Sequence, residues 1–112
     1  MAPQLHKSNF DNAAPKEWGK VTAHVASLPH ATITRVTIKP GGRWSTDIKP
    51  HVGGDSCQSL HTGVVLTGKL AIRMDDGSEE EFGENDVFVV PPGHDAWSVG
   101  DDDVVFVEFA AK

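Results

Sequence analysis

From Val21 onward, apolar and polar residues alternate in short runs that are separated by glycine, proline and aspartate. Residues 32–39 are rich in β-branched side chains and end at a Pro-Gly-Gly turn, which is typical of a strand. Leu70, Ile72 and Met74 alternate with their neighbours, so they would share the face of a strand that packs on a core. The pattern therefore predicts β structure over most of the chain.

The second half of the chain continues this pattern. Turn residues at 75–78 predict a hairpin that leads into residues 79–82. The uninterrupted apolar run 87–90 predicts a strand buried on both faces, and the positions Val105, Val107 and Phe109 alternate again after three aspartates. No segment has the apolar spacing of an amphipathic helix over three turns. The expected fold is an all-β sandwich or small barrel.

Residues 1–20 differ from the rest, because two prolines interrupt a mixed polar stretch with no sustained period. We expect an irregular arm that covers one edge of the fold and is anchored by Leu5, Phe10 and Trp18. Residues 21–112 would then form a single β-barrel domain, since no linker divides them.

Composition narrows the possible partners. A chain of 112 residues and 12.0 kDa is the size of one domain. Sixteen acidic residues against ten basic ones give a net charge of −6, which makes nucleic acid and anionic membranes poor partners. The single cysteine, Cys57, cannot form an internal disulfide, and the chain has no apolar run of about 20 residues and no leader-like start. These features predict a cytoplasmic protein.

Two short motifs lie between residues 40 and 93. One is His61-Thr-Gly-Val-Val-Leu-Thr-Gly68, and the other is Pro91-Pro92-Gly93 directly after the apolar run. On these residues the stretch 31–109 resembles the cupin superfamily, whose first motif ends in E-x₆-G and whose second contains P-x-G. His61 stands at the glutamate position of the first motif. The resemblance implies a single-domain double-stranded β-helix, or jelly-roll barrel.

The resemblance also implies a divalent transition metal in the barrel, which in cupins is zinc, iron, manganese, nickel or copper. The ligand positions depart from the family pattern. Counted from Gly41, the first motif histidine falls on Asp47, and counted back from His61 the second falls on Cys57. This disagreement indicates an insertion over residues 50–59. In the second motif the usual histidine is Ala96, but a histidine two residues earlier would share its face of the strand.

We therefore expect a metal set of His61, His94 and Asp47, with His51 and Cys57 as reserve ligands. Imidazoles with one carboxylate suit zinc, iron, nickel or copper better than magnesium or calcium. Hydrogen-bonded pocket histidines without a metal are the structural alternative, and so is a nucleophilic Cys57 with His61 as its base. Arg43, Trp44 and Trp97 are expected to line the substrate pocket, with Arg43 available to a carboxylate.

Two functions stay open on the sequence. The first is a metal-binding cupin that acts on a small organic molecule, as an oxygenase, isomerase, lyase or cyclase, with no catalytic residue assigned. The second is a non-catalytic barrel that binds or senses a small molecule without a metal. Cupins commonly pair, so a homodimer is also expected.

Overall fold

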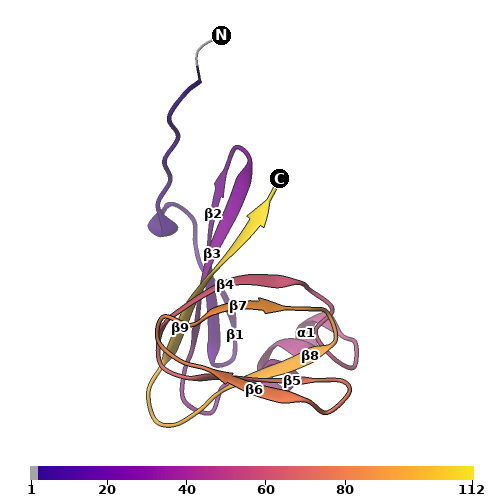
Figure 1. Cartoon of the computed structure of the whole chain (residues 1–112). Coiled ribbons are helices and arrows are strands. Elements are labelled where there is room, and N and C mark those ends of the chain that lie inside the picture. The colour runs from indigo at the N-terminus through magenta and orange to yellow at the C-terminus, as the bar shows by residue number, and fades with distance from the viewer. Residues whose placement is uncertain (1–2) are drawn as a thin grey trace.

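A computed structural model describes residues 3–112 and shows two antiparallel sheets that face each other (Figure 1). The larger sheet has the order β1 (Lys16–Trp18), β2 (Val21–Leu28), β3 (Ala31–Ile38), β9 (Val104–Ala111), β4 (His61–Thr67), β7 (Val87–Val90). The smaller sheet has the order β6 (Glu79–Phe82), β5 (Leu70–Met74), β8 (His94–Ser98). Helical turns are short, namely η1 (Phe10–Asn12), η2 (Trp44–Ile48) and α1 (Lys49–Val52). The expected all-β jelly-roll barrel is confirmed.

The core lies between the sheets and is built by inward-facing apolar residues of both. Leu70 and Ile72 of β5 are 2% and 6% exposed, which confirms the face predicted from their alternation. The larger sheet contributes Val65, Phe88 and Phe106, and the last two rings meet edge to face at 5.7 Å. Burial of apolar side chains from both layers holds the sheets together.

In two strands the buried residues differ from those that the sequence pattern predicted. In β7, Val87 and Val89 are 77% and 66% exposed, so the prediction of a strand buried on both faces is wrong. This strand ends the larger sheet, and only the side that carries Phe88 faces the other layer. In β9 the buried set is Val104 and Phe106, while the alternating residues between them face outward.

The N-terminal arm runs along the barrel only in part. Residues 16–18 pair with β2, and Trp18 packs against the core. Phe10 lies under the guanidinium of Arg35, 5.0 Å from ring centroid to Cζ. Leu5 is fully exposed, so it anchors nothing in its own chain, and the arm extends away from the barrel beside the β2–β3 hairpin (Figure 1). The first two residues of the expected arm lie outside the described residues.

Within residues 3–112, no helix combines the length and the apolar character that a membrane crossing would need.

Gly63 in β4 allows a close approach between β4 and β9. A Cβ atom at this position would overlap the carbonyl oxygen of Val107 and lie 3.0 Å from the Cα of Glu108. Both are backbone atoms of the neighbouring strand, so they cannot move aside as a flexible side chain would.

Gly63→Ala should therefore lower the free energy of unfolding by about 1–3 kcal/mol, the usual cost of overpacking a close contact. Thr62→Ala, on the exposed side of the same strand, is the matched control and should change it by less than about 0.5 kcal/mol. Urea unfolding followed by tryptophan fluorescence measures both. Equal stability of the two variants would contradict the close approach.

Candidate metal centre

A cavity of about 600 Å³ lies between the two sheets. Its walls are inward-facing residues of both layers, for example Val36 and Phe106 of the larger sheet and Ile72 of the smaller. Residues 52–54 and 56–59 complete the lining. The insertion inferred at residues 50–59 is therefore a wall of the cavity.

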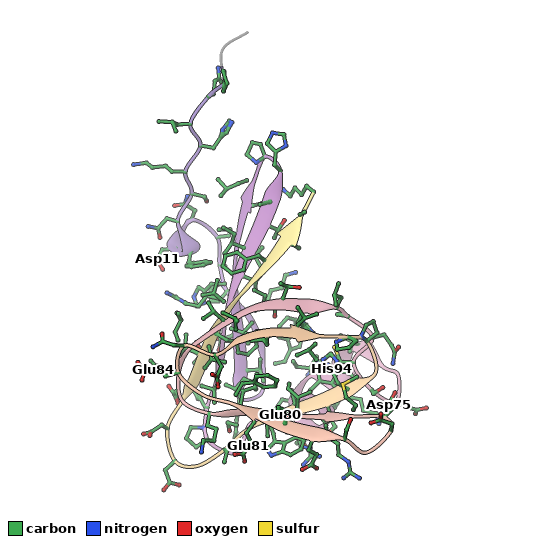
Figure 2. The ribbon with its side chains drawn as sticks, viewed as in Figure 1. Asp11, Asp75, Glu80, Glu81, Glu84 and His94 are labelled. Carbon is green, nitrogen blue, oxygen red and sulfur yellow. The ribbon has the colours of Figure 1, made fainter. Side chains whose placement is uncertain are left out.

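Three metal-binding side chains meet in this cavity. Cys57, His61 and His94 each offer one ligand atom, and these atoms all lie within 4.8 Å of one another. The Cys57 Sγ is 3.5 Å from the His61 Nε2, and the two imidazole rings meet edge to face at 5.1 Å. Figure 2 shows His94 between the two sheets. The cluster combines one side chain of the insertion with the first residues of β4 and β8.

Backbone pairing places the thiol. The Cys57 N–H donates to the His94 carbonyl at 2.7 Å, and the Cys57 carbonyl accepts from Gly93 N–H at 2.7 Å and from His94 N–H at 3.2 Å. Gly93 has φ +93°, a conformation that glycine adopts without strain. One residue earlier, the Ser56 hydroxyl donates to the Asp75 carboxylate at 2.9 Å. These contacts fasten the insertion to the start of β8.

Both histidines are oriented through Nδ1. His94 Nδ1 lies 2.7 Å from the Pro91 carbonyl, which can only accept, so this nitrogen carries the proton. His61 Nδ1 lies 2.6 Å from Glu108 Oε2. Ligand histidines are held in this way by carbonyls and carboxylates. Sequence reasoning missed Glu108, although a lone carboxylate in the apolar run of β9 was the available signal.

The thiol and the imidazole polarise each other. Burial alone would raise the pKa of Cys57, but hydrogen bonds with His61 and His94 outweigh it and lower this pKa to about 6. Burial would lower the pKa of His61, but its hydrogen bonds with Cys57 and Glu108 raise it to about 9. Without a metal, both shifts favour the thiolate form of Cys57 and the imidazolium form of His61.

The Cys57–His61 pair has the spacing of two ligands of a tetrahedral transition metal. Zinc bonds of about 2.3 Å to sulfur and about 2.0–2.1 Å to nitrogen, at the tetrahedral angle, separate the two ligand atoms by roughly 3.5 Å. The observed distance from Sγ to His61 Nε2 is 3.5 Å. A thiolate with two imidazoles suits zinc, copper or iron. Three protein donors also leave a coordination position for a further ligand.

No protein-family model and no curated protein matches the sequence. Solved structures match the fold. A sugar phosphate isomerase of the cupin superfamily from Silicibacter pomeroyi is 15% identical over 96% of this chain and 76% of its own, with a TM-score of 0.67. The polyketide cyclase RemF from Streptomyces resistomycificus is 15% identical over 96% of this chain and 80% of its own, with a TM-score of 0.68. This chain has the cupin fold. Oxalate decarboxylase from Bacillus subtilis, with Mn(II) centres, is 20% identical over 89% of this chain and 28% of its own, at a TM-score of 0.61.

The fold brings Cys57 to the two histidines and does not bring Asp47 to them. The Asp47 carboxylate accepts from the backbone N–H of Arg43 at 2.8 Å and of Lys20 at 3.2 Å, because η2 turns it back onto these loops. His51 is exposed on α1. The expected position of Asp47 beside the histidines is therefore wrong, and Cys57, one of the two reserve residues, occupies it instead.

The expected pocket residues separate into two groups. Trp44 lines the cavity and is 8% exposed. Arg43 and Trp97 lie outside it, since the alternation of β8 turns His94 inward and Trp97 outward. The Arg43 guanidinium lies 4.4 Å from the Trp97 ring centroid, and its Nε donates to Asp95 at 2.8 Å. Burial would raise the pKa of Asp95, but the bonds from Arg43 and a neighbouring serine hold it below its usual value.

In metal-free protein, the rate of Cys57 alkylation by iodoacetamide should rise with pH around a midpoint of about 6, because the thiolate is the reactive form. His61→Ala removes the main partner and should move the midpoint upward by roughly one pH unit or more. Mass spectrometry follows the labelling, and Cys57→Ser is the blank because the chain has one cysteine. A midpoint above pH 8 in the unsubstituted chain would contradict the thiolate–imidazolium pair.

Proposed function

We propose that this cupin binds a divalent transition metal through Cys57, His61 and His94 and acts on a small organic molecule in the adjoining cavity. The observation that supports it is the approach of three ligand atoms to within 4.8 Å of one another on the cavity lining. Zinc, iron and copper suit the set better than manganese, because a thiolate is a soft ligand. The thiol must stay reduced to bind, which favours the expected reducing, cytoplasmic compartment.

The chain's own residues would prepare the site in three ways. Glu108 holds the proton on His61 Nδ1, and the Pro91 carbonyl does the same for His94, so both rings keep a fixed orientation. The apolar walls exclude water from the reacting groups. A bound metal would supply Lewis-acid chemistry at a substrate oxygen. An oxygenase, isomerase, lyase or cyclase reaction would be compatible with such a site.

A metal-free barrel that binds or senses a small molecule is the second candidate. The observation that favours it is the direct contact of the Cys57 Sγ with the His61 Nε2 at 3.5 Å, in which the two groups satisfy each other. In that case the cavity alone would bind the ligand. Metal content separates the two candidates.

Untagged protein purified without chelators should contain about one transition metal ion per chain. Cys57→Ser, His61→Ala and His94→Ala should each lower the occupancy at least tenfold, since each removes one of three ligands. His51→Ala, which removes an exposed histidine of the same segment, should keep it unchanged. Elemental analysis by mass spectrometry gives the ratio. Metal-free protein of native stability would favour the second candidate.

We also propose that two copies pair through the outer face of the larger sheet. Val87, Val89 and Phe109 expose between 50% and 77% of their surface there. The arm carries a fully exposed Leu5 away from its own barrel. A second copy of the chain would cover both this leucine and the exposed apolar residues of the sheet. An apolar patch of this kind is self-complementary about a two-fold axis.

Light scattering at micromolar concentration should give about twice the chain mass of 12.0 kDa. The double variant Val87→Lys and Val89→Lys should give the single mass with unchanged circular dichroism, because like charges would face each other across the axis. The control double variant Glu79→Lys and Glu80→Lys, at exposed positions of β6, should remain dimeric. A single-chain mass for the unsubstituted protein would refute the dimer.

A further inference from the structure

The cavity beside the three ligand residues is lined mainly by apolar side chains. Both sheets and η2 contribute to its walls, and the side chains Val36, Trp44, Leu70, Ile72, Phe88 and Phe106 are at most 9% exposed. At about 600 Å³ it has the volume of pockets that enclose a drug-sized molecule. A ligand that fills it would bury most of its surface against carbon.

The polar side chains of the lining are largely engaged with the protein. Glu108 binds His61, the Ser56 hydroxyl binds Asp75, and the Gln58 amide binds Ser56 at 3.0 Å. Apart from the histidines, Lys16 of β1 is the cationic side chain among the described residues that line the cavity, and it is exposed. Thr34 and Ser59 also line the cavity, but a ligand with several hydroxyls or a phosphate would lose more hydration than these few partners replace, which is costly.

From these walls we infer that the substrate class is a predominantly apolar molecule with one oxygen-bearing group. That group would meet Cys57, His61 and His94, and the hydrophobic body would fill the space between the sheets. Sugar phosphates and small dicarboxylates such as oxalate are expected to bind more weakly, because the walls offer them few polar partners. The inference rests on the proposed function, because it assigns the substrate class of the same site.

Straight-chain monocarboxylates of four to ten carbons test the inference on zinc-loaded protein of measured metal content. Isothermal titration calorimetry should show the affinity rising about fourfold for each added methylene, until the cavity is full and the series levels off. Glucose 6-phosphate and oxalate should bind at least 100-fold more weakly than octanoate.

Ala23→Phe supplies the matched test, because Ala23 lines the cavity on β2 and is distinct from the three ligand residues. The larger side chain should weaken octanoate binding at least tenfold while about one metal ion per chain is retained. Thr62→Phe, which adds the same ring on the exposed side of β4, should leave both unchanged. Should the first variant fail to fold, the chain-length series in unsubstituted protein decides alone.

The possible outcomes separate this inference from the proposed function. A flat series, or sugar phosphate or oxalate bound as tightly as octanoate, would overturn the apolar substrate class even with one metal ion per chain. Protein that takes up no zinc but shows the fourfold increments would overturn the metal function and support the apolar ligand class. Increments together with stoichiometric metal would support both.

Discussion

The backbone pairing of Cys57 with Gly93 and His94 is the contact on which the site depends. The insertion itself buries little apolar surface, since Val52 within it and Leu60 directly after it are 61% and 62% exposed. Three hydrogen bonds of about 1 kcal/mol each are therefore a large part of what holds it against the barrel. Without them the Cys57 thiol would not be held 3.5 Å from the imidazole of His61, which lies on β4.

Charge balance explains why a mainly apolar cavity can accommodate Cys57, His61 and Glu108. Glu108 and the Cys57 thiolate are two negative charges on opposite sides of the His61 ring. An isolated ion in such surroundings would be costly, so each needs compensation. In the metal-free site the imidazolium supplies one positive charge. A divalent ion with neutral imidazoles would balance both, which agrees with the proposed metal function.

Local pattern was enough for several strands and turns and for the all-β class, because the alternation of side chains is a property of short segments. The jelly-roll fold followed from the resemblance of two short motifs to those of cupins. Features that depend on how distant segments meet in the fold could not be predicted from local pattern. The apolar run of β7 does not reveal that this strand ends its sheet, and Glu108 reaches His61 across 47 positions of sequence. Trp97 was predicted on the wrong face of β8, because the sequence alone does not show which of the alternating positions of this strand point into the cavity. Asp47 was misplaced because η2 replaced the strand that the motif implied.

The location of the thiol on an inserted segment has a consequence for how such a site can diversify. In this chain the third donor belongs to a surface excursion with two glycines, and the barrel strands supply only the imidazoles. A substitution at position 57 would exchange sulfur for oxygen or nitrogen while the barrel strands keep the two imidazoles in place. A change of preferred ion could then evolve independently of the scaffold's stability.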